Sequence, residues 1–156
     1  MPAAAVIHPA TLDDLPEIRA MLAEYADSLG IDLSFQDFAR EVRDLPGDYG
    51  PPSGALLVAH GETAALGMVA MRRRGAGRVE MKRLFVRPAA RRTGLGRQLV
   101  EAIITEARRD GYREMCLDTL PSMGDAQRLY ERLGFHDVAP YYDSPVAGTR
   151  YMSRAL

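Results

Sequence analysis

The stretch that decides the fold reads EMKRLFVRPAARRTGLG, from Glu80 to Gly96. The run from Val79 to Val86 is typical of a strand, and it loses strict alternation at Leu84, Phe85 and Val86, as a buried or bulged strand does. Pro88 ends this strand, and a polar loop follows. Apolar residues then recur at helical spacing before Gly111: Leu95, Leu99, Ile103 and Ala107. The stretch therefore predicts a strand, a loop and a helix, in that order.

The loop between this strand and this helix has the composition of an anion-binding site. A helix N-terminus offers unpaired N–H groups and a partial positive charge, and both favour phosphate oxygens. Gly94 and Gly96 let the backbone approach an anion closely. Arg91 and Arg92 can add charge-assisted contacts to the same oxygens. A glycine pair alone fits a mere tight turn equally well, but strand, arginines, glycines and helix in this order indicate a phosphate-bearing ligand.

Two better-known phosphate loops are excluded by their spacing. The P-loop requires a lysine and then a serine or threonine after its last glycine, whereas Arg97 and Gln98 follow Gly96. The dinucleotide fingerprint requires a third glycine three residues beyond the second, and Leu99 stands there.

Upstream of this stretch, the sequence predicts one short strand and two helices. Val6 and Ile7 suggest the strand. Thr11 with Asp14 is typical of an N-cap that opens a helix. Ser34 with Asp37 repeats the pattern and predicts a second helix that runs to about residue 43.

The remaining patterns predict further strands and one more helix. Residues 45–54 contain three prolines and three glycines and predict an irregular loop. Residues 56–59 and 65–71 predict a hairpin that turns at His60 and Gly61, and residues 113–119 predict another strand.

Downstream, Ser122 with Asp125 predicts a helix N-terminus, and Gly134 its end. Tyr141, Tyr142 and residues 150–156 suggest closing strands. Early hairpins with a central strand–helix–strand unit imply a mixed sheet with helices on its faces.

Composition limits the class of protein. The 156 residues, 47% hydrophobic and 26% charged, are typical of one soluble globular domain, so we expect a single domain over residues 1–156. A single cysteine, Cys116, excludes an internal disulfide and suits a reducing compartment. No run approaches the roughly 20 apolar residues of a membrane span, and residues 3–7 do not read as a signal peptide. We therefore expect a cytoplasmic protein.

Charge is unevenly distributed along the chain. Residues 1–62 hold eleven acids and three arginines, whereas residues 72–97 hold ten of the 20 lysines and arginines and one acid, Glu80. Such a basic block fits an anion site, a nucleic-acid patch or a solvated face. A nucleic-acid-binding protein using the block 72–97 therefore stays open at this point, although the interleaved aromatics of a single-strand binder are missing.

The stretch from Glu80 to Phe135 resembles a known family. The strand is followed by Arg-x-x-Gly-x-Gly at Arg91, Gly94 and Gly96. After the next predicted strand, residues 126–135 read AQRLYERLGF, which is similar to the Ala-x-x-Leu-Tyr-x-x-x-Gly-Phe signature of the GNAT superfamily of N-acetyltransferases. The resemblance implies a GNAT-like α/β fold, with a mixed, mostly antiparallel sheet that is splayed around an acyl-CoA and flanked by helices.

The resemblance also implies a binding site for acetyl-CoA as co-substrate. Its pyrophosphate would lie on the backbone N–H groups of Arg92 to Arg97. The whole implied phosphate loop is Arg91, Arg92, Thr93, Gly94, Leu95, Gly96 and Arg97. Leu84, Phe85 and Val86 would pair their backbone with the pantetheine arm, and one of these N–H groups would polarise the thioester carbonyl. Many relatives place an asparagine on this arm where Met123 stands here, so Ser122 or a backbone group would have to replace that contact.

Transfer to an amine needs a base and an acid. An alkyl amine has a pKa near 10.4, so a base must remove its proton, directly or through water. Glu80 is the candidate, since it is the only acid in the basic block and matches a position that some relatives use as a base; a salt bridge to Arg78 or Lys82 is the structural alternative. Tyr130 resembles the family's proton donor to the departing sulfur, and it could equally belong to the core.

The sequence also predicts what the site lacks. His8, His60 and His136 are far apart in the sequence and share no ligand spacing with Cys116 or with a carboxylate cluster, so no metal is expected. Cys116 is expected to be buried packing, so direct attack in a ternary complex is the expected mechanism. The acceptor is an amine of a small molecule or peptide, and the sequence does not identify it. Its expected lining is Phe35, Phe38, Tyr49, Arg83, Tyr141 and Tyr142.

One further class of function has the same fold. A CoA-binding regulatory module would hold the ligand with little turnover. We expect no nucleic acid and no membrane among the partners, and the resemblance implies that a homodimer can form.

Overall fold

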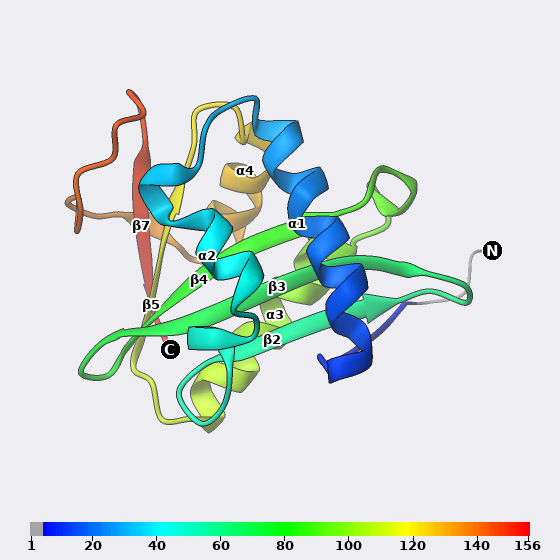
Figure 1. The fold of residues 1–156 in the computed structure, drawn as a ribbon. Helices are drawn as coiled ribbons and strands as arrows, with labels where there is room; N and C mark the ends of the chain where they lie inside the picture. Colours follow the sequence, from blue (N-terminus) through cyan, green and yellow to red (C-terminus); the bar gives the residue numbers. More distant parts are fainter. Residues whose placement is uncertain (1–4) are drawn as a thin grey trace.

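One seven-stranded sheet organises the chain (Figure 1). The computed structural model describes residues 5–156. In sheet order the strands are β1 (Val6–Pro9), β2 (Ala55–His60), β3 (Ala65–Gly75), β4 (Arg78–Val86), β5 (Glu114–Thr119), β7 (Arg150–Ala155) and β6 (His136–Asp137). Only β4 and β5 pair in parallel among these strands, because α3 (Leu95–Arg109) forms the crossover between them. The sheet is therefore mixed and mostly antiparallel, as expected.

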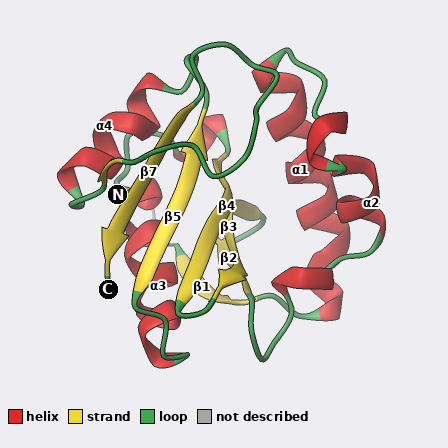
Figure 2. Cartoon of the chain, turned by 90° about the vertical axis from the view of Figure 1, so that its left-hand side faces the viewer, coloured by secondary structure: helices red, strands yellow, loops and turns green. Residues whose placement is uncertain are grey.

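The helices cover both faces of the sheet (Figure 2). On one side lie α1 (Leu15–Leu29) and α2 (Phe38–Arg43), and on the other lie α3 and α4 (Gly124–Arg132). Among the described residues, four short 3₁₀ turns complete the elements: η1 (Leu12–Asp14), η2 (Ser34–Gln36), η3 (Gly47–Tyr49) and η4 (Pro88–Ala90). No helix within residues 5–156 is both long enough and apolar enough to cross a bilayer.

Alternation along the strands divides the core into two layers. Leu57 and Ala59 of β2 pack in the layer beneath α3, whereas Leu56 and Val58 pack in the layer beneath α1. The helical positions that the sequence predicted on α3 are all buried in the first layer: Leu95, Leu99, Ile103 and Ala107. Two apolar layers on one sheet explain why strands such as β2 are apolar at successive positions.

Some local predictions were wrong. The expected second helix is interrupted at Asp37, whose left-handed backbone (φ 55°) separates η2 from α2. Ser122 does not cap α4, because the N-cap is Met123. Tyr141 and Tyr142 lie in a bend and not in a strand. The capping pattern of Thr11 and Asp14 is present, with the Thr11 N–H donating to Asp14 Oδ2 at 2.8 Å, but it opens η1, and α1 follows.

Candidate active site

The two central strands separate in the middle of the sheet. Their pairing runs from Arg78 opposite Glu114 to Glu80 opposite Cys116. Within the described part of the chain, no strand pairs with the β5-facing edge of β4 from Met81 to Val86. Backbone N–H and C=O groups along this edge are therefore available to a ligand that lies in the opening.

A bulge sits in β4 where the strands diverge. Phe85 faces Met68 of β3 and Lys82 faces Ala70, so β4 has one residue more than β3 in this interval. Arg83 adopts a left-handed backbone there, with φ 62°. As a result, Leu84 and Val86 pack on the α3 side of the sheet and Phe85 on the α1 side. Of the two alternatives that the sequence left open, both apply to β4: it has a bulge at Arg83, and Leu84, Phe85 and Val86 are apolar at successive positions because both faces are buried.

The loop after β4 delivers the N-terminus of α3 beside this open edge. Arg92 and Gly94 have left-handed backbones, with φ 64° and 85°. The first intrahelical bond at this end is donated by Gln98 to Gly94 O at 3.1 Å. Among residues 5–156, none accepts a hydrogen bond from the N–H groups of Arg92 to Arg97. These unpaired donors fit a diphosphate.

The two glycines of the loop serve different purposes. Gly94 needs to be glycine because its φ of 85° is unfavourable for any side chain. Gly96 has no such backbone requirement, and a Cβ there would meet Leu129 at 3.7 Å and Val86 at 3.9 Å, which are ordinary contacts. The protein itself would therefore tolerate alanine at residue 96.

The arginines and threonine of the loop are only partly engaged. Arg91 Nε donates to Val86 O at 3.1 Å, and the Thr93 hydroxyl donates to Ala90 O at 2.5 Å. Arg97 pairs with Glu101 at 2.9 Å on the surface of α3. Arg92 is exposed. The Arg91 and Arg92 guanidinium groups therefore keep donors for an anion.

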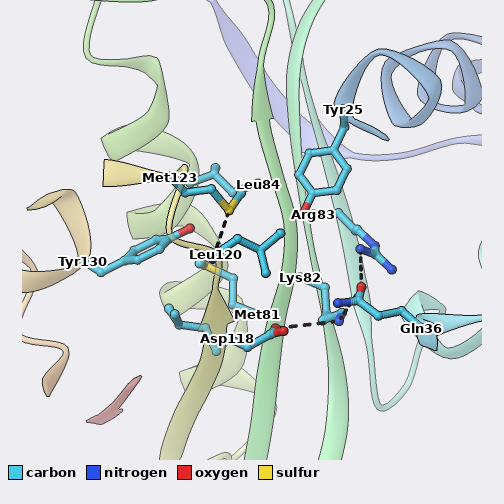
Figure 3. Close-up of a pocket in the computed structure, with 11 residues that line it drawn as sticks. Tyr25, Gln36, Met81, Lys82, Arg83, Leu84, Asp118, Leu120, Met123 and Tyr130 are labelled. Atoms are coloured by element: carbon cyan, nitrogen blue, oxygen red, sulfur yellow. Dashed lines mark hydrogen bonds and ion pairs between the residues drawn. The ribbon is translucent and has the colours of Figure 1, made fainter. Parts of the chain in front are cut away.

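A small cavity of about 30 Å³ occupies the opening between β4 and β5. Figure 3 shows side chains entering it from α1, α4 and both strands. Its lining is Tyr25, Gln36, Met81, Lys82, Arg83, Leu84, Leu117, Asp118, Leu120, Met123 and Tyr130. The cavity is thus apolar on the α3 side and polar on the α1 side.

Tyr130 belongs both to the core and to the cavity. Its ring packs edge-on against Phe135 with centroids 5.8 Å apart, and the residue is 5% exposed. Its hydroxyl points into the cavity (Figure 3), and no group within residues 5–156 hydrogen-bonds to it. Burial raises the pKa of Tyr130, so the phenol stays protonated at neutral pH. The ring of Tyr130 can therefore pack in the core while its hydroxyl is available to a ligand in the cavity.

Glu80 is fully buried and does not line the cavity. Arg72 Nε donates to Glu80 Oε1 at 3.0 Å, and the Tyr141 hydroxyl donates to Oε2 at 2.8 Å. Arg74 lies 3.7 Å from the same carboxylate. The sequence offered a salt bridge of Glu80 with Arg78 or Lys82 as the structural alternative. The arginines that pair with Glu80 are instead Arg72 and Arg74 of β3. Any proton exchange between Glu80 and the cavity needs an intermediary.

Two charged cavity residues were missed from the sequence. Lys82 and Asp118 point to the same face of the sheet as Glu80, with Lys82 Nζ 3.9 Å from Asp118 Oδ1 and 3.5 Å from Gln36 Oε1. Tyr142 donates to Asp118 Oδ2 at 2.5 Å. Burial, followed by the charge of Arg83, lowers the pKa of Lys82. Strand alternation from Glu80 could have indicated Lys82, but nothing local pointed to Asp118.

Arg83 anchors the segment that covers the cavity. Its guanidinium donates to both oxygens of Glu41 at 2.8 and 3.0 Å and to Gln36 Oε1 at 2.7 Å. Phe38 lies under the guanidinium at 5.0 Å. The sequence placed Arg83 in the acceptor lining, but its guanidinium donors are engaged by Glu41 of α2 and Gln36 of η2. It fixes the wall of the site.

Other predicted lining residues fall into separate places. Tyr49 lines a second cavity of about 280 Å³ between α2, η3 and β3, which shares Gln36 with the first. Phe35 and Phe38 pack against the core beneath α1. Tyr141 and Tyr142 lie beside Glu80 and Asp118 through the hydrogen bonds already described. None of these five aromatic residues lines the first cavity.

Met123 and Cys116 both make contacts that stabilise the fold. Met123 Sδ accepts a hydrogen bond from the Leu120 N–H at 3.4 Å, so the thioether closes the turn into α4 and faces the cavity. Cys116 is buried, and burial together with the charge of Glu80 raises the pKa of its thiol to about 11. A protonated, buried thiol is a poor nucleophile.

Much of the basic block is neutralised within the fold. Arg87 pairs with Glu17 at 2.9 Å and with Glu24 at 2.7 Å, both on α1. Arg83 pairs with Glu41 and Arg72 with Glu80. Three acids of the N-terminal third, Glu17, Glu24 and Glu41, therefore serve as partners for the block, and Arg91 and Arg92 in the loop before α3 keep charge for an external anion.

The sequence and the fold were compared with those of known proteins. The sequence model described as "Acetyltransferase (GNAT) family" matches residues 16–135. An uncharacterized N-acetyltransferase of Schizosaccharomyces pombe is 43% identical over 141 residues, which cover 89% of this chain and 86% of that protein.

Solved structures share the fold at low identity. A GNAT-family acetyltransferase of Staphylococcus aureus superposes with a TM-score of 0.82 at 18% identity, covering 97% of this chain and 99% of that chain. The PaiA N-acetyltransferase of Thermoplasma acidophilum, solved in complex with coenzyme A, superposes with a TM-score of 0.77 at 13% identity, covering 99% and 100%.

Proposed function

This chain belongs to the acetyltransferase (GNAT) family, and from that membership we propose that it transfers an acetyl group from acetyl-CoA to an amine. The single observation that carries the proposal is the row of unpaired N–H groups from Arg92 to Arg97, set at the end of the unpaired edge of β4. A ligand that carries a diphosphate and an amide-bearing arm could bind these N–H groups with the diphosphate and the unpaired edge of β4 with the arm. A CoA complex in a protein of the same fold supports this choice.

The donor would be held by backbone more than by side chains. The N–H groups of Arg92 to Arg97 would bind the pyrophosphate, with Arg91 and Arg92 adding charge. The backbone of Leu84 to Val86 would pair with the pantetheine arm along the open edge. The thioester supplies an activated acyl group, and an N–H group of this edge would stabilise the negative charge that develops on its oxygen.

The residues of the chain would move the protons. The amine attacks the thioester carbonyl carbon, the new C–N bond forms and the C–S bond breaks. Tyr130 would give its hydroxyl proton to the leaving sulfur, since its hydroxyl points into the cavity and has no other partner among the described residues. Glu80 would take the proton of the amine through a water, because its carboxylate lies behind the cavity lining.

The acceptor amine would enter from the α1 side of the sheet. Lys82, Asp118 and Gln36 are the polar groups on that side of the cavity, and they would orient the acceptor. The apolar wall on the other side, formed by Met81, Leu117 and Leu120, would exclude bulk water from the reacting carbon.

Thermal unfolding with acetyl-CoA tests the donor site. Acetyl-CoA at about 100 times its Kd should stabilise the protein by roughly 2.7 kcal/mol, which is a shift of several degrees at this size. ATP and NAD serve as controls for general anion binding. A shift with acetyl-CoA alone supports the donor site, and no shift at saturating concentration would remove it. Binding without release of free thiol for any amine tried would instead favour the regulatory module.

Glu80→Gln tests the proposed base. Gln keeps the shape and an oxygen for Arg72 but removes the acceptor of the proton. We expect kcat to fall and the acid limb of the pH profile to flatten. Because a buried partner of an arginine also matters for stability, the melting temperature has to be measured alongside. An unchanged pH profile in a folded variant would sink the assignment.

A further inference from the structure

A cluster of metal-ligating side chains lies outside the active site. His8 of β1, Asp14 of η1 and His60 of β2 each offer one ligand atom, and these atoms lie within 4.8 Å of one another. None of the three lines either cavity described above. Separation along the sequence hid this cluster, because His60 lies 46 residues beyond Asp14.

Strand register brings the two histidines together. Val6 pairs with His60 and His8 pairs with Val58 in the antiparallel β1–β2 ladder, so His8 and His60 are diagonal neighbours on one face. Their rings stack with centroids 5.1 Å apart and planes 6° from parallel. The face is the one covered by α1, since Val58 packs in the core layer beneath that helix.

Asp14 completes the cluster from above. η1 follows β1 directly, and the Thr11 N–H and hydroxyl donate to Asp14 Oδ2 at 2.8 and 3.0 Å. This leaves Oδ1 directed at His60, whose Nε2 lies 2.9 Å away. Asp14 is only 9% exposed, so its carboxylate has little freedom to turn elsewhere.

The outer contacts orient the ligands as they do in protein metal sites. His8 Nδ1 lies 2.8 Å from Pro9 O, and because a carbonyl only accepts, Nδ1 carries the proton in this contact and Nε2 is left with a lone pair. A histidine ligand held by a backbone carbonyl and a carboxylate ligand held by other donors are the usual second layer of such sites.

We propose that His8, Asp14 and His60 form a binding site for one borderline divalent transition metal ion, with Zn²⁺ as the preferred ion. Two imidazole nitrogens and one carboxylate oxygen are a donor set that Zn²⁺ favours, and three protein ligands leave a fourth position for water. Metal–ligand distances of about 2.0–2.2 Å place tetrahedral ligand atoms roughly 3.3 Å apart. His60 and Asp14 are already close to this separation. The His8 ring would have to move closer to the other two ligands, and it is only half-buried.

The ion would fasten the start of α1 to the edge of the sheet. Its ligands come from two adjacent strands and from the turn that leads into α1. Because none of them touches the cavity, the site would act on stability and leave the chemistry of acyl transfer unchanged.

Isothermal titration of the metal-free, tag-free full chain with ZnCl₂ tests the proposal. We expect one Zn²⁺ per chain for the wild type, no binding of Mg²⁺, and a rise in melting temperature with Zn²⁺. His8→Gln and His60→Gln should each weaken Zn²⁺ binding at least tenfold. His136→Gln is the matched control, since this exposed histidine lies on β6 at the opposite edge of the sheet.

Two results would overturn the site. One is the absence of stoichiometric Zn²⁺ binding to the wild type, which would leave the cluster as a stacked and hydrogen-bonded pair of histidines. The other is wild-type affinity in both His8→Gln and His60→Gln. Circular dichroism confirms that each variant is folded, and His8→Gln keeps the hydrogen bond of His60 to Asp14 if the second variant is unstable.

Discussion

Tyr130 is the residue on which the proposed proton transfer depends most directly. Tyr130→Phe keeps the ring against Phe135 and removes only the hydroxyl. We expect kcat to fall by about 100-fold, because general acid catalysis contributes about 10²–10⁴, while the melting temperature stays near that of the wild type. A free-thiol assay measures turnover. Tyr112→Phe, whose hydroxyl donates to Ser53 O outside the cavity, should turn over like the wild type. Full activity of Tyr130→Phe would assign this residue to the core alone.

The charged side chain of Lys82 should lower the free energy of unfolding at neutral pH. The pKa of its ammonium is lowered from 10.5 in the fold, so the charged form is less favourable in the folded state than in the unfolded state. Below the folded pKa this cost is fully present. Between the folded pKa and 10.5 the unfolded state binds more protons, so stability rises with pH, and above 10.5 the cost is gone.

Lys82→Met combined with Asp118→Asn should therefore raise the melting temperature at pH 7, since replacing both charges of a buried pair by neutral side chains is often stabilising. The difference from the wild type should shrink as the pH approaches 10.5. Unfolding scans at pH 7 and pH 10 measure both effects, with exposed Arg73→Met as the control for loss of a cation. A variant less stable than the wild type at pH 7 would mean that the pairing with Asp118 outweighs the cost of burial.

At the scale of elements, the N-terminus of α3 contains two glycines, Gly94 and Gly96, whose replacement should have different effects. Gly94→Ala should destabilise the protein by about 1 kcal/mol or more, because its φ of 85° disfavours a side chain. Gly96→Ala should leave the melting temperature unchanged or raise it, since its Cβ makes only ordinary contacts and alanine favours a helix. The same variant should weaken acetyl-CoA binding at least tenfold by titration calorimetry. Wild-type affinity of Gly96→Ala would place the diphosphate elsewhere.

Helices and strands could be predicted from the sequence where neighbouring residues determine them. The period of α3, the loop before it and the irregularity of β4 are all visible in a short window, because helical periodicity and strand alternation report on immediate neighbours. The break at Asp37 was not visible in such a window, since the contact between Arg83 and Glu41, 42 residues apart, decides how α2 sits. Asp118 and the cluster of His8 with His60 depend in the same way on sheet register.

At the scale of the whole molecule, both core layers depend on one sheet. β2, β3 and β4 each contribute side chains to the layer beneath α1 and to the layer beneath α3. Losing either layer would expose apolar side chains on one face of the same strands. The salt bridges of Arg87 to Glu17 and Glu24 further connect α1 to the end of β4. These shared strands couple the two layers energetically.

Unfolding should therefore be a single cooperative transition. Far-ultraviolet circular dichroism reports on helices and strands, and near-ultraviolet circular dichroism reports on the seven tyrosines, which lie on both sides of the sheet and in the bend beside it. We expect the two signals to give coincident curves in urea, with equal midpoints and slopes. Saturating acetyl-CoA should move both curves together, because its proposed site spans β4 and the start of α3. An earlier transition in the near-ultraviolet signal alone would show that the tertiary packing around the tyrosines is lost before the helices and strands unfold, and it would contradict a single transition.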